Sequence, residues 1–214
     1  MITKFFLLDW KGLVCALVLG GVVVAFSRDL WIRNLFLLVA FLLVSVFVTK
    51  YRHKEKREKG LYEHERGWEN VISNGFIPGL CIVLFYFYGE KFIFSYICSV
   101  AAVASDKFAS ELGVLSGNPI SLKNFKRVKQ GTSGAISAVG TFMAFVGSVI
   151  IGTIAYFLYK FDPFLVFYIG FAGFVGCFFD SFAGIFEEEG IGNKSTSNLI
   201  CSAIGAILGL VVNW

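Results

Sequence analysis

Long apolar runs separated by short polar stretches make up most of the chain. Each run consists of continuous apolar residues, without alternation between apolar and polar positions. Runs of this kind predict membrane-spanning helices, which need about 20 residues, and exclude a β-barrel, whose strands alternate with a period of two. The predicted helices cover residues 12–27, 31–49, 71–88, 92–105, 134–159, 164–186 and 197–213.

Two of these runs are irregular. The run at 92–105 is short for a full crossing, so it either continues through Asp106 toward Gly113 or forms a broken helix. Pro78 and Gly79 interrupt the third run, and a membrane tolerates such an interruption only where neighbouring helices or water satisfy the freed backbone groups. The interruption therefore favours a cavity nearby.

Composition places the chain among integral membrane proteins. Hydrophobic residues make up 57% of the chain and charged residues 16%, against about 45–50% and about 25% in soluble domains. These values exclude an ordinary soluble enzyme and a nucleic-acid-binding tail. We predict an all-α fold, a polytopic integral membrane helical bundle of about seven transmembrane helices. It forms a single domain over residues 1–214, with two helices and a basic loop in 1–59 and the candidate motifs in 60–214.

The distribution of Lys and Arg predicts the orientation. With the N-terminus in the cytoplasm, most of the 19 Lys and Arg residues fall on the cytoplasmic side, as the positive-inside rule requires. The polar stretches at 50–74, 106–133 and 187–198 then share that side. We therefore expect a multi-pass protein of the cell membrane whose site faces the cytoplasm and whose partners are not nucleic acids. The sequence leaves formation of a homodimer open.

One carboxylate lies within the sixth predicted helix. At about 100° per residue, Asp180 shares one helix face with Gly170, Gly173, Gly176 and Gly184. Small residues on one face allow close helix packing, so we expect Asp180 to point into the protein. A carboxylate within a membrane is unfavourable and indicates a functional site; the alternative is a structural pair with a neighbouring Lys or a helix end.

Asp106 and Glu111 flank the point where the fourth predicted helix meets the cytoplasm. On a continuous helix they lie about 140° apart, so they share a metal ion only where the helix breaks or a second helix adds a ligand; Ser110 stacks on Asp106 instead. Mg²⁺ is usually held by one or two carboxylates together with substrate phosphates. Asp106, Glu111 and Asp180 are therefore the candidate metal ligands, and a charged interfacial belt is the alternative.

The polar segment before the fifth predicted helix has features of a phosphate site. Backbone N–H groups at a helix N-terminus, together with the positive end of the helix dipole, bind anions. The residue order of a Walker A motif is absent, so a plain helix start is an equal alternative. The candidate residues are Lys123, Arg127, Lys129, Gly131, Thr132, Ser133, Gly134 and Ser137.

A second polar face lies where the chain enters the third predicted helix. Arg66, Asn70 and Asn74 recur at every fourth position, so a guanidinium and two amides lie on one side of a helix. Such a face can bind phosphate or the edge of a base. These residues are further candidates for substrate or nucleotide binding.

Four segments, in order along the chain, resemble a known family of membrane proteins. They read RGWENVISNG at 66–75, SDKFASELG at 105–113, GTSGAIS at 131–137 and DSFAG at 180–184. The family includes plant and cyanobacterial phytyl-phosphate kinase and many archaeal and animal members without an assigned activity. It is more distantly similar to CTP-dependent polyprenol kinases and CDP-archaeol synthase. Where the family commonly has Asp-Thr-Trp, this chain has Asp106, Lys107 and Phe108, so Lys107 adds a positive charge beside a candidate ligand.

The resemblance implies an isoprenoid kinase. Such an enzyme transfers the γ-phosphoryl group of a nucleotide, here CTP, to a prenyl monophosphate such as phytyl or geranylgeranyl phosphate, giving a prenyl diphosphate and CDP. By this similarity Asp106, Glu111 and Asp180 hold Mg²⁺, and Lys129 is also catalytic. The residues that bind substrate or nucleotide are Arg66, Asn70, Asn74, Lys107, Ser110, Lys123, Arg127, Gly131, Thr132, Ser133, Gly134, Ser137 and Ser181.

Two other functions remain open at the level of sequence. A cytidylyltransferase similar to CDP-archaeol synthase would use the same nucleotide and metal but release pyrophosphate and leave CMP on the lipid. A membrane carrier or scaffold would use Asp106 and Asp180 as ion or proton sites in broken helices, although the chain shows no inverted repeat. The nature of the products separates the two enzymes.

Overall fold

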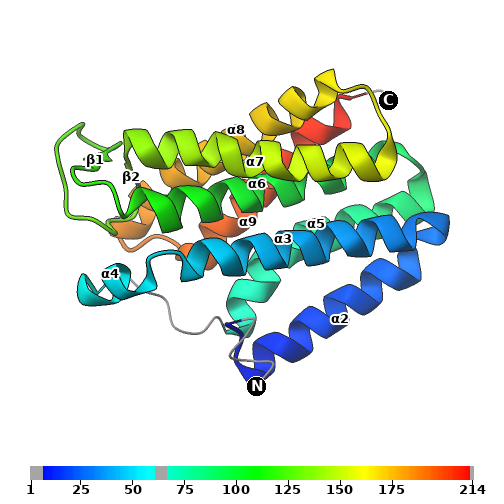
Figure 1. Ribbon diagram of the computed structural model, residues 1–214, viewed down its shortest axis with the longest axis horizontal. Helices are drawn as coiled ribbons and strands as arrows, with labels where there is room; N and C mark the ends of the chain where they lie inside the picture. The colour runs from blue at the N-terminus through cyan, green and yellow to red at the C-terminus, as the bar shows by residue number, and fades with distance from the viewer. Residues whose placement is uncertain (1–6, 61–66, 213–214) are drawn as a thin grey trace.

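Helices account for nearly all of the regular structure. The computed structural model describes residues 7–60 and 67–212, and Figure 1 shows its elements in chain order. The helices are α2 (Trp10–Phe26), α3 (Trp31–Lys50), α4 (His53–Glu58), α5 (Trp68–Tyr88), α6 (Lys91–Gly113), α7 (Ala138–Tyr159), α8 (Phe164–Glu188) and α9 (Lys194–Leu210), with a 3-10 turn, η1, at Arg28–Leu30. Strands β1 (Ile120–Ser121) and β2 (Ala135–Ile136) form an antiparallel ladder that pairs Ile120 with Ile136.

All of the predicted apolar helices form. The uncertain run at 92–105 continues through Asp106 to Gly113 as one unbroken helix, α6. The fifth helix begins later than expected, at Ala138 and not at Gly134, because the chain before it pairs with β1. Ser137 then caps α7, since its side chain accepts a hydrogen bond from the Gly140 N–H.

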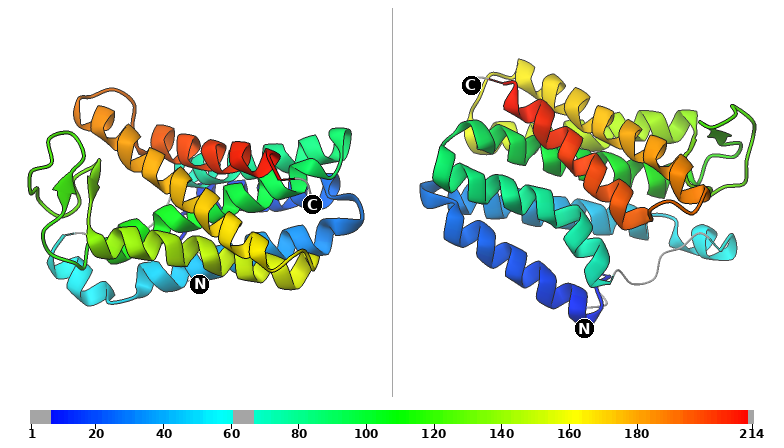
Figure 2. Two further views of the ribbon diagram at one scale, coloured as in Figure 1. Left: turned by 90° about the horizontal axis from the view of Figure 1, so that it is seen from above. Right: turned by 180° about the vertical axis from the view of Figure 1, so that it is seen from behind.

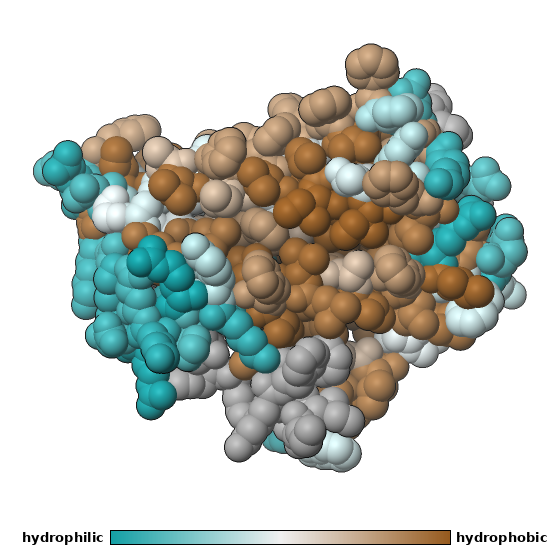
Figure 3. Space-filling model, viewed as in Figure 1, coloured by the Kyte–Doolittle hydropathy of each residue, from teal (hydrophilic) through white to brown (hydrophobic). Residues whose placement is uncertain are grey.

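The surface has the character of a membrane protein. Of the described helices, five are long and apolar enough to cross a membrane: α3 with η1, α5, α6, α7 and α8. Helices α2 and α9 have 17 residues each. Figure 3 shows an apolar band across the middle of the molecule with hydrophilic residues gathered at its two ends. The chain is thus a polytopic helical membrane protein, as the composition predicts.

Helix α6 lies at the centre of the bundle. It contacts α3, α5, α7, α8 and α9, and every residue from Ile93 to Phe108 is buried. Small residues make this packing possible. A Cβ atom added to Gly173 of α8 would lie 2.5 Å from the Ser148 Cβ of α7 and 2.9 Å from the backbone of Ala101 in α6, so three helices meet at this glycine.

Pro78 bends α5 without ending it. The helix is continuous from Trp68 to Tyr88 and packs against α2 and α6, and the right-hand view of Figure 2 shows a bend along its length. Proline removes one helical hydrogen bond and displaces the preceding turn, which accounts for the bend. Pro78 and Gly79 are both buried against neighbouring helices.

The polar stretches gather at one end of the bundle. Helix α4, the β1–β2 ladder and the turn between α8 and α9 lie together at the left of Figure 1. The C-terminal end of α6 reaches the same region, so the arrangement of the polar stretches on one side agrees with the prediction from charge. The candidate site lies at this end.

Candidate active site

A cavity of about 660 Å³ lies at the polar end of the bundle. Its walls come from α6, α7, α8, the first residue of α9 and the segment before α7. Three of the four motifs therefore meet in one place, although they are far apart in the sequence. The predicted residues that line it are Asp106, Ser110, Glu111, Gly131, Thr132, Ser133, Gly134, Ser137, Asp180 and Ser181.

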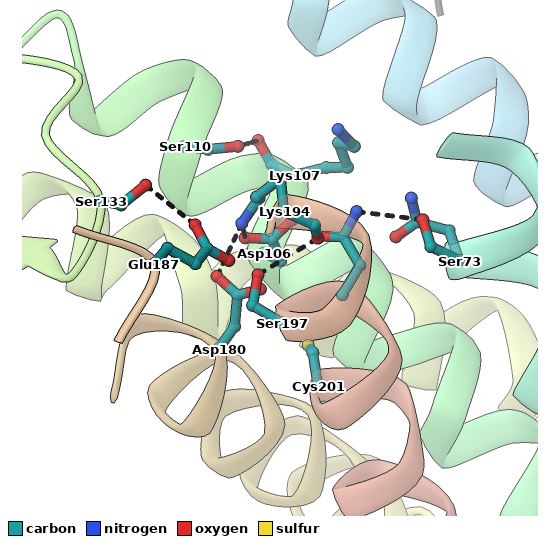
Figure 4. A network of polar contacts seen from close by, with 12 residues as sticks. Ser73, Asp106, Lys107, Ser110, Ser133, Asp180, Glu187, Lys194, Ser197 and Cys201 are labelled. Carbon is teal, nitrogen blue, oxygen red and sulfur yellow. Dashed lines mark hydrogen bonds and ion pairs between the residues drawn. The ribbon is translucent and has the colours of Figure 1, made fainter. Parts of the chain in front are cut away.

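Asp106 and Asp180 form a carboxylate pair in this cavity. Both are nearly buried, with 4% and 6% of their surface exposed, and Asp180 points inward, as its glycine face predicts. Lys194, the first residue of α9, lies between them (Figure 4). Its Nζ is 2.8 Å from Asp180 Oδ2 and 3.4 Å from Asp106 Oδ1. A single ammonium group thus bridges carboxylates from two helices.

Each carboxylate of the pair keeps one unsatisfied oxygen. Among the described residues, no hydrogen-bond donor reaches Asp106 Oδ2, Asp180 Oδ1 or Oε1 of Glu187, although all three atoms are buried. Buried acceptors are almost always satisfied, so a set left open in a cavity indicates a ligand with positive charge or hydrogen-bond donors. The other oxygen of Glu187 accepts a hydrogen bond from Ser133 Oγ at 3.0 Å.

The charge of the cavity is strongly acidic. Its described lining holds Asp106, Glu111, Asp180 and Glu187 but only one basic side chain, that of Lys194. An anionic phosphate would be repelled from such a surface unless a cation accompanied it. No three His, Cys, Asp or Glu residues of the described chain are close enough to enclose a metal ion by themselves. Two carboxylates with open oxygens nevertheless suit Mg²⁺ that also binds substrate phosphates.

Glu111 does not join the carboxylate pair, contrary to the expected set of three ligands. Its Oε2 lies 2.8 Å from Lys56 Nζ and its Oε1 accepts a hydrogen bond from Thr49 Oγ1 at 2.8 Å. Because α6 is unbroken, Glu111 and Asp106 face different neighbours, and the second carboxylate comes from α8. Lys56 is fully buried and also donates to the carbonyls of Val48 and Thr49, so its side chain joins α4 to the ends of both α3 and α6.

The segment predicted to bind phosphate lies before α7, outside the helix itself, and lines the cavity from Gln130 to Ser137. The glycines before α7 belong to a turn, and the Ser133 N–H donates to Glu188 Oε1 at 3.0 Å. Gly134, at φ +69°, packs directly on Gly184 of α8: a Cβ atom on Gly184 would lie 2.4 Å from the Gly134 nitrogen. The two glycines therefore bring the turn against α8 and place Ser133 beside the carboxylates.

Replacing Gly184 with alanine tests this contact. The added methyl group would push the turn away from α8, and overpacking of this kind destabilises a protein by about 1–3 kcal/mol. We expect a lower midpoint of thermal unfolding in detergent, measured by circular dichroism. Gly21→Ala on α2 is the matched control, because nothing lies within 4 Å of its Cβ position. Equal midpoints for the two variants would contradict the close approach.

Comparison with known proteins identifies the family. The integral membrane protein family DUF92 matches residues 1–207. The chain belongs to this family. It is 35% identical to an uncharacterized membrane protein of Methanocaldococcus jannaschii, over 99% of this chain and 88% of that protein. It is 30% identical to an uncharacterized membrane protein of Synechocystis, over 58% of this chain and 51% of that protein. It is 25% identical to Protein VTE6, chloroplastic, of Arabidopsis thaliana, over 97% of this chain and 67% of that protein. No solved structure matches the chain.

Several expected residues of this DUF92 protein lie outside the cavity. Asn74 donates to the Asn70 carbonyl at 2.8 Å, so the amides of α5 bond within their own helix. Lys107 is buried and follows Asp106 on α6, but it does not line the cavity. The prediction for Arg66 falls outside the described residues. The loop lysines and arginine also lie away from the cavity lining, namely Lys123, Arg127 and Lys129.

Sequence reasoning missed two residues of the DUF92 cavity. Glu187 lies seven positions after Asp180, almost two helical turns, so the two side chains share one face of α8. This spacing could have identified Glu187 from sequence. From sequence, Lys194 is one more basic residue of the polar stretch at 187–198. Nothing in its local sequence distinguishes it from the other lysines, because its partners come from α6 and α8.

Proposed function

We propose that this DUF92 protein is a prenyl-monophosphate kinase. The observation that carries the proposal is the cavity itself, in which the Asp106–Asp180 pair with its open oxygens lies at a polar end and an apolar wall begins beside it. That wall includes Phe174 and Phe178 of α8, and Phe178 is 47% exposed on the outer surface of the bundle. An amphiphile with a charged head and a prenyl tail fits the polar end with its head and the apolar wall with its tail.

The motif resemblance supports the choice of reaction. The similarity to the phytyl-phosphate kinase family covers the segments at 105–113, 131–137 and 180–184, and all three line this cavity. A metal site formed only by two aspartates also agrees with phosphoryl transfer, in which the substrates supply the remaining oxygen ligands.

In the proposed reaction, a phosphate oxygen of the prenyl monophosphate bonds to the γ-phosphorus of CTP. The bond between that phosphorus and the β–γ bridging oxygen breaks, and CDP leaves with the electron pair. Asp106 and Asp180 would hold Mg²⁺, which neutralises phosphate charge when bound. Ser133, Ser181 and Ser137 lie on the cavity wall and would orient the phosphates. The acceptor is already ionised, so no general base is needed.

Product analysis tests the proposal. The protein, purified in detergent with Mg²⁺ and geranylgeranyl or phytyl monophosphate, is given CTP or ATP, and the lipid and nucleotide products are resolved by mass spectrometry. We expect prenyl diphosphate and CDP. Pyrophosphate with a CMP-lipid would instead indicate the cytidylyltransferase. Absence of turnover with either nucleotide would contradict a kinase and leave cation binding in the acidic cavity, as in a carrier, as the better assignment.

We further propose that the cavity faces the cytoplasm. The bundle end that holds it also holds α4, which contains Lys54, Lys56 and Arg57, and the basic loop between β1 and β2. Cytoplasmic loops are enriched in Lys and Arg. This orientation gives the site access to soluble nucleotides while its lipid substrate stays in the bilayer.

A further inference from the structure

Lys194 occupies the position where the site needs positive charge. Its ammonium group lies within 3.4 Å of one oxygen from each aspartate, and Figure 4 shows it at the centre of the polar cluster. Two buried carboxylates repel one another unless a counter-charge lies between them. In the described lining of the cavity Lys194 is the one side chain that supplies it.

The side chain of Lys194 is more exposed than those of its partners. Its side chain is 47% exposed, whereas the side chains of Asp106 and Asp180 are 5% and 8% exposed. Lys194 is the first residue of α9 and has a flexible four-carbon stem, so its ammonium can move toward the cavity without disturbing the helix. The aspartates, in contrast, are placed by the packing of α6 and α8.

We propose that Lys194 is the exchangeable counter-ion of the site. It offsets part of the negative charge of Asp106 and Asp180 when no divalent cation is bound, moves away from them when the cation binds, and then contacts substrate phosphate. This rests on the metal site of the proposed function but adds a role for a residue outside the motifs. An ammonium and a divalent cation held by the same two carboxylates repel one another, so the lysine lowers metal affinity while keeping the empty site stable.

The test is direct binding of Mn²⁺, a paramagnetic substitute for Mg²⁺, followed by electron paramagnetic resonance without nucleotide or lipid. For Lys194→Met we expect at least tenfold tighter Mn²⁺ binding than for the unmodified protein. Lys194→Arg keeps the charge and should bind Mn²⁺ about as weakly as the unmodified protein. Lys91→Met, at the opposite end of α6, is the matched control and should leave Mn²⁺ affinity unchanged.

Unchanged or weaker Mn²⁺ binding in Lys194→Met overturns the proposal, and so does the absence of binding in every variant. A Lys194→Met/Asp106→Asn double variant, which restores the charge balance, covers the case in which the single variant fails to fold; it should bind Mn²⁺ more tightly than Asp106→Asn alone. In turnover assays, Lys194→Met should lower kcat while the Mg²⁺ concentration needed for half-maximal rate falls. Tighter Mn²⁺ binding without any kinase activity would support the counter-ion role and reject the proposed reaction.

Discussion

Replacement of Asp180 with asparagine is expected to lower prenyl-phosphate turnover by on the order of 10²–10³-fold, the size of effect seen when one electrostatic group of an active site is removed. The amide keeps the shape of the side chain but removes the charge that would hold Mg²⁺. Asp180 is 6% exposed and has one oxygen without a partner among the described residues, so the substitution leaves the surrounding packing unchanged.

The stability of Asp180→Asn distinguishes a functional carboxylate from a structural one. Neutralising one of two adjacent carboxylates removes repulsion and leaves Lys194 paired with Asp106, so the free energy of unfolding should change by less than about 1 kcal/mol. Product formation and thermal unfolding are measured on the same preparation. Asp29→Asn, an exposed aspartate in η1, is the control. Normal turnover in Asp180→Asn, or a large loss of stability, would assign the pair a structural role.

Replacement of Lys56 with methionine is expected to destabilise the protein by about 3–5 kcal/mol, because breaking a buried ion pair leaves an uncompensated charge. Lys56 is fully buried, and its Nζ bonds to Glu111 and to two carbonyls at the end of α3. Lys54→Met on the exposed side of α4 is the control and should change the free energy of unfolding by less than about 0.5 kcal/mol. Chemical denaturation in mixed micelles measures the difference.

A double variant, Lys56→Met/Glu111→Gln, decides what Glu111 does. Removing both charges should restore most of the lost stability, since the methionine fills similar volume and no buried charge stays unpaired. If Glu111 is structural, the double variant keeps its turnover. Loss of turnover in a stable double variant would indicate that Glu111 is a metal ligand. The comparison separates two roles that a single substitution of Glu111 would confuse.

The helices of this protein could be predicted because lipid imposes a simple pattern on them. Every predicted apolar run corresponds to a helix, and α6 proved continuous where its short apolar run left two possibilities. The inward direction of Asp180 also followed from sequence, because the glycines that share its face must pack against other helices. The periodicity of the sequence is therefore enough to predict where the helices lie and which face of α8 points inward.

The partners of the charged residues could not be predicted in the same way. Lys56 lies in a run of mixed charge that is typical of an exposed helix, yet it is fully buried because α4 folds back on the end of α6. Lys194 meets residues 14 and 88 positions away along the chain. Such pairs depend on how helices are arranged, and a single sequence does not specify that arrangement.

The conformation of the turn before α7 could not be predicted, for a local reason. Its glycines and hydroxyls are equally typical of a helix start and of a tight turn, and the short β1–β2 ladder that decides between them holds only two residues in each strand. Strands of that length leave no readable alternation in the sequence.

The central position of α6 has a consequence for how the protein enters the bilayer. Of the five long apolar helices, α6 has the lowest hydropathy, 1.4, and it contains Ser95, Ser99, Ser105, Asp106 and Lys107. Charged residues within a span oppose its insertion by the translocon. The segment that holds Asp106 is thus the one that lipid accepts least readily by itself, and its stable insertion depends on the helices that later surround it. Membrane insertion therefore favours an apolar α6, whereas the candidate chemistry needs the charged Asp106 in the same helix.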